Sequence, residues 1–517
     1  MSDALDQGIT VTQIQAMDEP VGVAAQTTAA FVGCALRGPL HTPVEIDSIA
    51  AFRDRFGRPT GRGSLGPAVQ QFFDHGGQRL FVVRVANNAT GAVLRLPTDG
   101  GTLTLRAVEP GAAERVRAAI DYDGCRDDDS ATFNLTVQRV SSASGLVRDQ
   151  EIYSRVSVDP EHRHFIADAL LGSGLVRAEH PLPAERPLCT GPGGLNLPAG
   201  YADPAQRGTD GDDLSDYDLI GSARSQIGMF ALNGVERFDI LYLPPEGRRR
   251  DLGPAAVLAA ELYARERGAM LILDPPSSWF TVEDAVDGVR SAGYASANIL
   301  AYFPRMVLRN DATAEPQPVG AAIAGLLCKL DAQRGPWEDL DQPGFALQRE
   351  LKPAVYVSPS DGAALVKEGL NTIAGSSASR AALCGSVTLA RNAQVERQFT
   401  SLTVRRLCLR MTNSIGRATR WAVFEAGGPR TAERVRAQVH AYLSALADMG
   451  AFADDRFEVQ CESAAHLGPL DPLRGVNVLL TFRPIECDEI INLTVHQTVQ
   501  GCRVSSTAFA PTAAECA

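Results

Sequence analysis

The sequence has few of the residues that mark a nucleic-acid-binding or a disulfide-bonded protein. Lysine occurs three times in 517 residues, and Asp plus Glu (61) outnumber Lys plus Arg (49), which gives a net charge of −12. A surface that follows nucleic-acid phosphates needs the opposite sign, so we expect no nucleic acid among the partners. The ten cysteines never form a Cys-x-x-Cys pair, which argues against zinc ribbons and redox motifs and favours free, buried thiols.

The sequence also lacks a long hydrophobic run. Its longest apolar stretch of low charge, residues 319–328, is about half as long as the roughly 20 residues of a transmembrane helix. Residues 1–8 are acidic and lack the basic-then-apolar order of a signal peptide. We therefore expect that the protein is synthesised in a cytoplasm and is not inserted into a membrane. With 45% hydrophobic and 21% charged residues, the chain has a globular composition.

The spacing of apolar residues predicts an α/β and α+β protein of several domains. Residues 49–56 are typical of a helix closed by Gly57, and residues 80–85 of a buried strand. Residues 238–303 alternate strands and helices, which predicts a doubly wound parallel sheet. Later, two amphipathic helices flank a predicted strand at Trp421–Phe424. We expect an N-terminal arm (1–28), an α/β part (29–86), an inserted β-rich domain (87–213), a central α/β domain (214–398), a C-terminal α+β domain (399–488) and a C-terminal strand arm with a tail (489–517).

The central α/β part has few signs of catalysis. No phosphate-binding Walker loop and no Gly-x-Ser-x-Gly elbow occurs, and all eight histidines lie outside residues 181–439. A Gly-x-Gly-x-x-Gly pattern at residues 61–66 follows a predicted helix instead of a strand, which favours a plain loop. We therefore expect no catalytic residue, no cofactor and no nucleotide.

Two groups of residues keep an enzymatic or metal-binding reading open. Asp274 follows a predicted strand where a catalytic carboxylate could lie, with Asp239 and Asp251 nearby in sequence, although a capping or turn role is favoured. His162 and His164 could form a metal pair, although solvated loop histidines are the favoured interpretation. We expect no metal site.

Both ends of the chain alternate apolar and polar residues as strands do. An unpaired strand is a template for pairing with another chain, so these segments are candidate intersubunit arms. Pairing of both termini within their own chain is the alternative. The candidate arm residues are Ile9, Val11, Ile14, Ile491, Leu493, Val495 and Val499.

Several motifs, in this order and spacing, resemble the contractile tail sheath proteins of phage tails and contractile injection systems. Phe31-Val32-Gly33, Arg37-Gly38-Pro39 and Phe81-Val82-Val83-Arg84-Val85 resemble the N-terminal signature of that family. Ile272-Leu273-Asp274-Pro275-Pro276 and Ala301-Tyr302-Phe303-Pro304 resemble its central domain, and Arg420-Trp421-Ala422-Val423-Phe424-Glu425 its C-terminal domain. The resemblance implies a central domain with a subtilisin-like topology and no protease activity.

The resemblance also implies a function and partners. Many copies would form a helical sheath around an inner tube, bound by a baseplate and by terminator or cap proteins, and contraction would drive the tube through a target envelope. The particle would assemble in the bacterial cytoplasm and act as a virion tail or an extracellular injection particle. Arg430, Arg434 and Arg436 are candidate tube-facing residues on a predicted helix. The alternatives are a specialised copy near the baseplate or cap, and an α/β hydrolase-like enzyme with a β accessory domain.

Overall fold

The computed structural model describes most of the chain. The described residues are 21–22, 26–58, 63–125, 131–141, 144–191, 200–309, 315–342, 344–375, 380–392, 397–425, 428–463, 475–485, 487–498 and 501–509. They form two compact units, one from Gln26–Arg334 and Glu338–Leu402, and a second built on the described part of Thr403–Ala517. Within the described residues, no helix is both long and apolar enough to cross a membrane.

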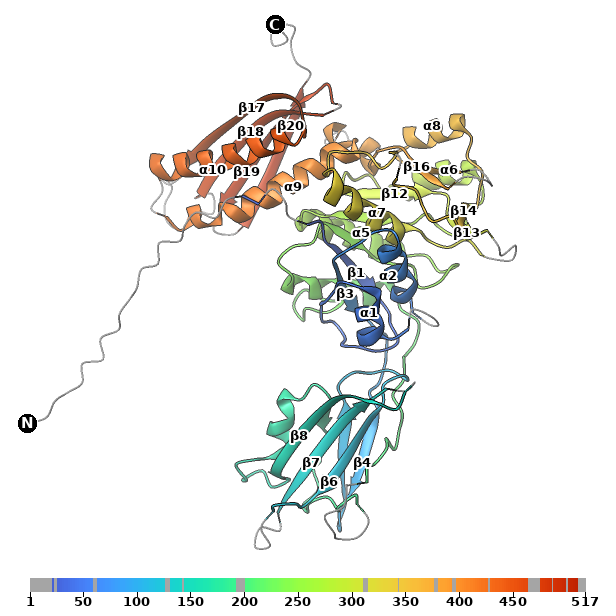
Figure 1. Ribbon diagram of the computed structural model, residues 1–517, viewed down its shortest axis with the longest axis vertical. Coiled ribbons are helices and arrows are strands. Elements are labelled where there is room, and N and C mark those ends of the chain that lie inside the picture. Colours follow the sequence, from blue (N-terminus) through green and yellow to red (C-terminus); the bar gives the residue numbers. More distant parts are fainter. Residues whose placement is uncertain are drawn as a thin grey trace, which may run out of the picture. The chain divides into compact units, whose positions relative to one another are not determined.

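An eight-stranded sheet organises the first unit (Figure 1). Its strands, in spatial order, are β16 (Ala382–Cys384), β15 (Asn371–Ala374), β12 (Ile299–Phe303), β11 (Met270–Leu273), β10 (Ile240–Tyr242), β1 (Ala29–Gly33), β3 (Leu80–Arg84) and β2 (Val44–Ile46). The six inner strands are parallel, and the edge strands β2 and β16 are antiparallel to their neighbours. All five residues of β1 and of β12 are buried, as expected for parallel strands covered on both faces. The predicted parallel sheet is therefore confirmed, and segments 29–86 and 214–398 share it.

Helices cover both faces of this sheet. On one face α2 (Leu65–Asp74) packs against α7 (Gly320–Gln333), and the rings of Phe31, Phe72 and Tyr242 meet edge to face. On the other face lie α5 (Pro254–Glu266), α4 (Asp216–Ile220) and the 3₁₀ helix η2 (Gly228–Gly234). The remaining elements of this part are α1 (Ile49–Phe56), α6 (Val282–Ala292), α8 (Pro359–Lys367), the 3₁₀ helices η3 (Leu389–Asn392) and η4 (Arg397–Phe399), and the strand pair β13 (Met306–Leu308) and β14 (Leu351–Pro353).

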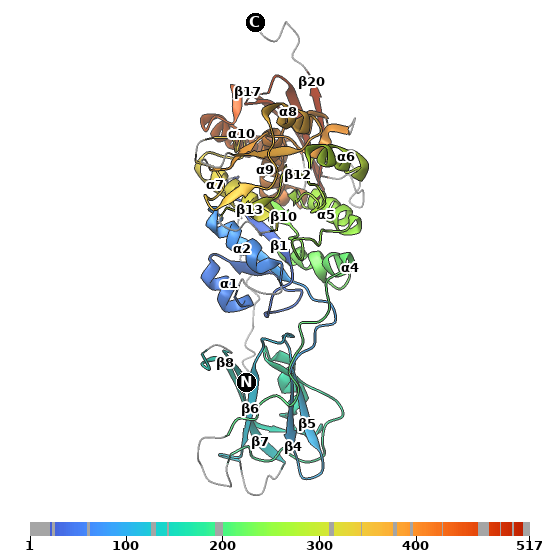
Figure 2. The same ribbon diagram turned by 90° about the vertical axis from the view of Figure 1, so that its right-hand side faces the viewer.

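Residues 93–178 form two antiparallel three-stranded sheets around one shared hydrophobic core (Figure 2). The first sheet contains β4 (Val93–Pro97), β5 (Thr102–Ala107) and β9 (Val176–Ala178), and the second contains β6 (Val116–Asp121), β7 (Thr132–Val140) and β8 (Val147–Ser157). A short helical segment, α3 (Ile166–Ala169) followed by η1 (Leu170–Gly172), completes this β-rich insertion. The two connecting chains pair with each other at Asn87–Asp212 and Thr90–Thr209.

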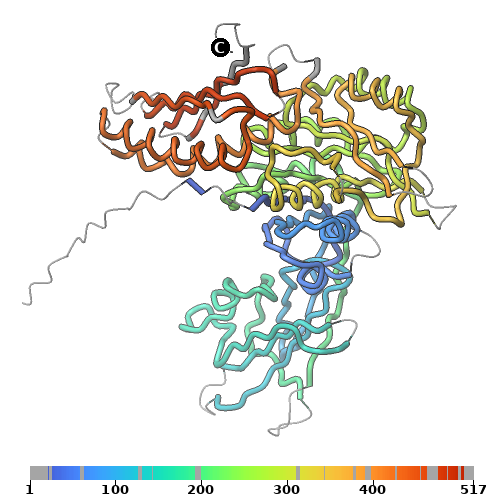
Figure 3. The backbone as a smooth tube through the Cα atoms, turned by 45° about the horizontal axis from the view of Figure 1, so that its top comes forward, coloured from blue at the N-terminus to red at the C-terminus, as the bar shows by residue number. Residues whose placement is uncertain are grey.

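The second unit is an antiparallel meander with helices. Its strands follow the chain order β17 (Phe452–Ser463), β18 (Gly475–Pro484), β19 (Ile490–Thr498) and β20 (Gly501–Phe509). α9 (Leu402–Ala418) and α10 (Pro429–Asp448) are the two predicted amphipathic helices, and Figure 3 shows them, in orange, beside the red strands. Buried and half-buried residues alternate along β18 and β19, so the sheet has one covered face.

Two expectations differ from this structure. The predicted strand Trp421–Phe424 is wrong, because residues 420–423 form the 3₁₀ helix η5, with Ala422 N–H bonded to Thr419 O and Phe424 N–H to Trp421 O. A boundary between residues 488 and 489 does not separate two bodies, because β19 and β20 extend the same sheet as β17 and β18.

Candidate functional site

Asp274 directly follows β11, and its side chain caps the first turn of helix α7. Its carboxylate accepts hydrogen bonds from the Val319 and Gly320 N–H groups at the beginning of α7, both at 2.9 Å, and from the Tyr242 hydroxyl at 2.5 Å. The group is buried, and burial raises the pKa of Asp274 above its ordinary value. Its hydrogen-bonding capacity is used to satisfy α7, as the capping interpretation predicts.

The two aspartates near Asp274 in sequence also hold the chain together. Asp239 accepts a hydrogen bond from the Thr28 N–H at 3.0 Å and from Arg237 Nε at 2.9 Å, which ties β1 to β10. Asp251 pairs with Arg305 and accepts hydrogen bonds from the Ser277 N–H and hydroxyl. Each of the three carboxylates thus accepts hydrogen bonds from the chain around it.

The two loop histidines lie in the inserted part of the chain, near the end of β8. Their ring centroids are 5.9 Å apart, and His162 Nδ1 accepts a hydrogen bond from the His164 N–H at 3.1 Å. No group of three His, Cys, Asp or Glu side chains among the described residues has the arrangement of a metal site. Because His162 Nδ1 already accepts a hydrogen bond from a backbone N–H, the pair has the geometry of a turn, in agreement with the interpretation as loop histidines.

The predicted C-terminal arm lies within a sheet of its own chain. β19 pairs with β18 along one edge and with β20 along the other. Ile491, Leu493 and Val495 are buried there, at 0%, 1% and 0% exposure. Ile9, Val11, Ile14 and Val499 lie outside the described residues. The edge strands of this sheet are β17 and β20, and they are where a strand from another copy would find unpaired backbone groups.

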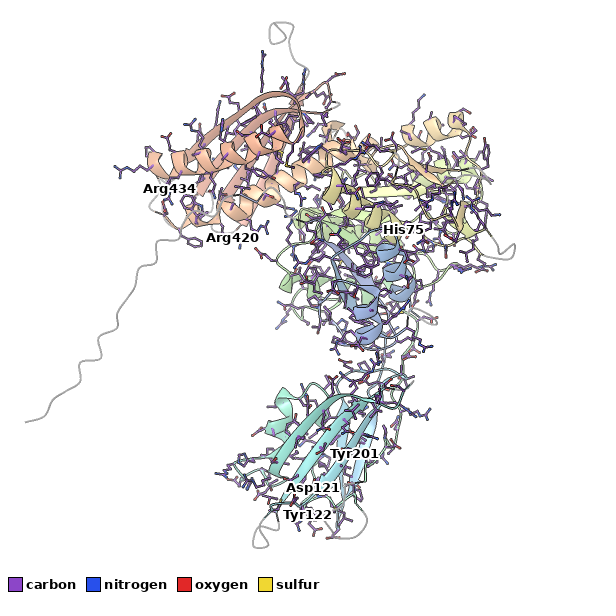
Figure 4. The ribbon with its side chains drawn as sticks, viewed as in Figure 1. His75, Asp121, Tyr122, Tyr201, Arg420 and Arg434 are labelled. Atoms are coloured by element: carbon purple, nitrogen blue, oxygen red, sulfur yellow. The ribbon has the colours of Figure 1, made fainter. Side chains whose placement is uncertain are left out.

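The three arginines proposed to contact a tube do not share one face of α10. At about 100° per residue, Arg436 lies about 160° around the helix from Arg434, while Arg430 and Arg434 lie on the same side. Arg434, labelled in Figure 4, pairs with Glu425 at 2.7 Å, and its guanidinium lies 4.2 Å from the centre of the Trp421 ring. Arg436 pairs with Glu433 at 3.0 Å, and Arg430 is exposed. Arg434 is thus already held by its own chain.

A buried charge cluster in the inserted part is absent from the sequence predictions. Arg139 on β7 pairs through Nε with Glu114 at 2.5 Å and through a terminal nitrogen with Glu109 at 3.3 Å. Arg55 of α1 pairs with the same Glu109 at 2.8 Å, so the cluster joins the insertion to the sheet-covering helices. Burial raises the pKa of Glu114, and Arg139 opposes that rise. Only tertiary contact brings these residues together, and no local pattern marks them.

The closeness of the insertion to the core is also visible at Arg84. This guanidinium, 1% exposed at the end of β3, donates to the carbonyls of Ala35, Gly38 and Pro110. Pro110 belongs to the insertion, while the other two carbonyls follow β1. One buried cation therefore satisfies three backbone acceptors from both parts.

Comparison with solved structures extends over almost the whole chain. The sheath tail protein of Listeria innocua superimposes with a TM-score of 0.61 at 13% sequence identity, covering 94% of this chain and 95% of that chain. The chain described here therefore has the fold of tail sheath proteins. The anti-feeding prophage helical sheath in its contracted state matches with a TM-score of 0.50 at 15% identity, covering 98% of this chain and 96% of that one.

The same sheath fold occurs in a second setting. A chain of the anti-feeding prophage baseplate matches with a TM-score of 0.50 at 15% identity, covering 93% of this chain and 95% of that chain. No protein-family model and no curated protein sequence matches this chain. The likeness is therefore one of fold, present at sequence identities near 15%.

Proposed function

We propose that this chain is the structural subunit of a helical contractile sheath around an inner tube. The observation that carries the proposal is the match to a sheath tail protein along 94% of this chain and 95% of that chain, since a subunit sharing only one domain would not align end to end. Copies joined by a head-to-tail contact that does not close generate a helix. Contraction to a shorter, wider state would drive the tube through a target envelope, with the energy coming from new contacts between subunits.

The proposed partners are further copies of this chain, the inner tube protein, the baseplate, and a terminator or cap. Assembly would occur in the bacterial cytoplasm, followed by action as a virion tail or an extracellular injection particle. The central domain, residues 214–398, would have a subtilisin-like topology that serves as a scaffold and performs no proteolysis. The three separate structural pairings of Asp239, Asp251 and Asp274 support a non-enzymatic role.

The terminal segments would link neighbouring copies by strand addition. In this proposal residues 9–15 of one copy meet the sheet that contains residues 489–499 of another, and backbone hydrogen bonds hold the subunits while their bodies rotate. The open edges of β17 and β20 support such an addition. Deletion of residues 1–20 should leave a folded protein that stays monomeric. Tubes of normal length from the truncated chain would contradict the arm proposal.

Arg430, Arg434 and Arg436 are the proposed tube-facing residues, but α10 cannot turn all three toward a tube at once. Because Arg430 and Arg434 share a side of α10, charge reversal of this pair should weaken loading of an acidic tube more than reversal of Arg436 alone. Equal loading by both variants and by the unaltered chain, judged by electron microscopy, would exclude the role.

A specialised copy at the baseplate or cap is the second candidate. The match to a baseplate chain of the anti-feeding prophage, at a TM-score of 0.50, favours keeping it. Negative-stain electron microscopy of the purified chain, with and without its tube protein, separates the two. Wide tubes with a cogwheel cross-section are expected for the bulk sheath, and short rings for the specialised copy. Single particles under both conditions would contradict both.

A further inference from the structure

The first unit contains a cavity of about 310 Å³ at the carboxyl ends of β11 and β12. Leu273 of β11, Ala301 of β12, Val257 of α5, Val289 of α6 and Trp279 in the loop between β11 and α6 are among the residues that line it. Well-packed interiors contain few voids larger than a water molecule. An apolar space with room for roughly ten water molecules is therefore a distinct feature of this fold.

The sequence around α6 explains why the space stays open. α6 begins at a capping box, in which Thr281 and Asp284 satisfy the first N–H groups, so its position is set by its ends. Its apolar side chains lie on one side, yet only Ala285 is fully buried among its residues. Opposite the helix, β12 presents the single methyl group of Ala301, which is 4% exposed. The small side chain of Ala301 and the incompletely buried apolar face of α6 leave this volume unfilled.

Trp279 is held in a fixed position at the wall of this cavity. Its indole lies so close to α6 at Gly288 that an added Cβ there would come within 2.3 Å of the ring. Gly288 therefore allows the indole to lie flat against the helix, where a larger residue would displace it. A rigid aromatic wall is typical of pockets that bind ring systems, because stacking then costs little side-chain entropy.

The charged groups of the wall already have partners. Asp251, Asp274 and Arg305 are the charged side chains among the described residues that line the cavity. Arg305, 4% exposed, donates to the Pro275 carbonyl at 2.8 Å and to the Arg248 carbonyl at 2.7 Å, and it pairs with Asp251. Asp274 accepts the three hydrogen bonds described above. A charged ligand would lose its hydration without gaining a free counter-charge, which disfavours it strongly.

We propose that this cavity is a binding site for a small, uncharged, largely apolar molecule with one or two rings. The volume suits a two-ring molecule, Trp279 offers a face for stacking, and the paired wall charges select against ions. Ligands of open α/β sheets bind beyond the carboxyl ends of the strands, where this cavity lies. The inference does not depend on the proposed sheath function, because it concerns the subunit alone.

Titration of the full-length chain with 6-propionyl-2-(dimethylamino)naphthalene tests the site. This neutral probe with two fused rings emits strongly only when it leaves water. We expect saturable binding of one probe per chain, with a Kd of about micromolar order, and energy transfer from Trp279 to the bound probe. Trp279→Phe should remove most of that transfer while probe emission remains. Non-saturable binding, or transfer unchanged in Trp279→Phe, would overturn the proposal, because the probe would then bind elsewhere.

A matched pair of variants on α6 locates the site independently. Ala292 lines the cavity at the exposed end of α6, so Ala292→Trp should fill the entrance and weaken probe binding at least tenfold. Asp287 is exposed on the same helix and does not line the cavity, so Asp287→Trp should leave binding unchanged. The probe should also raise the thermal midpoint of the unaltered chain and of Asp287→Trp, but not that of Ala292→Trp. Equal affinity in all three proteins would overturn the proposal.

Discussion

Removal of the arginine at the centre of the buried charge cluster should loosen the inserted β-rich part. The Arg139 side chain is 8% exposed, and its partners Glu114 and Glu109 are 1% and 6% exposed. Arg139→Met keeps an unbranched, largely apolar side chain but leaves Glu114 buried without its paired counter-charge, while Glu109 keeps its pair with Arg55. Breaking a buried ion pair from one side costs about 3 to 5 kcal/mol. We expect a loss of that size, confined to the insertion and its junction with α1.

Hydrogen exchange of the full-length chain measures this loss locally. Peptides from β6 and β7 should exchange roughly 10² to 10⁴ times faster in Arg139→Met, since about 1.4 kcal/mol corresponds to a factor of ten. The deficit should shrink at low pH, because the unpaired Glu114 carboxylate then takes up a proton and loses its charge. Peptides from the eight-stranded sheet should change little.

A second ion pair in the same part of the chain provides the control. Arg106 and Glu179 join β5 to the segment after β9, but their side chains are 42% and 33% exposed. Arg106→Met should cost less than about 1 kcal/mol, because water screens an exposed pair. Restoring neutrality with Arg139→Met plus Glu114→Gln should recover part of the loss. If Arg139→Met and Arg106→Met accelerate exchange equally, the reasoning from burial is refuted.

Three further outcomes follow from the same contacts. Asp274→Ala should lower the unfolding free energy of the first unit by about 3 kcal/mol, because three buried donors lose their acceptor, and an unchanged thermal midpoint would contradict this. The Nε2 atom of His75 (Figure 4) accepts a hydrogen bond from the Gln348 N–H, and burial lowers the pKa of His75 from the usual 6.5. The unfolding free energy should therefore fall by up to about 1.4 kcal/mol per pH unit as the pH drops below 6.5, because the unfolded chain then takes up a proton first. His75→Gln should flatten this slope in urea unfolding. Asn87 and Asp212 form an isolated antiparallel bridge, so replacing the chain between them by a two-residue turn should leave a remainder that still unfolds cooperatively by circular dichroism. Loss of the transition would show that the insertion is needed for folding.

Local signals in the sequence were sufficient for many individual elements. The helix at 49–56 has the bounds that were predicted, because Ser48 caps its first turn and Gly57 ends it. The parallel strands were recognisable as continuous apolar runs, since both faces of such a sheet are buried. The motifs resembling sheath proteins indicated the fold that the structural comparison then showed.

Tertiary contacts decided what local patterns could not. Trp421–Phe424 has the apolar composition of a strand, but it follows α9 directly and pairs with none of the strands described, so it closes as a 3₁₀ turn. The segment at 490–498 has the alternation of an arm and of a central strand alike, and the presence of β18 and β20 on its two edges made it central.

By itself the sequence determined where several helices and strands form, the parallel class of the main sheet and the likeness to sheath proteins, because caps, turns and periodicity act over a few residues. The structure alone decided which charges meet and where space remains. Glu114 and Arg139 are 25 residues apart and Arg55 is farther still, and the cavity beneath α6 is lined by residues from Pro245 to Leu389. Contacts over such separations depend on how the chain packs as a whole, which no short stretch of sequence encodes.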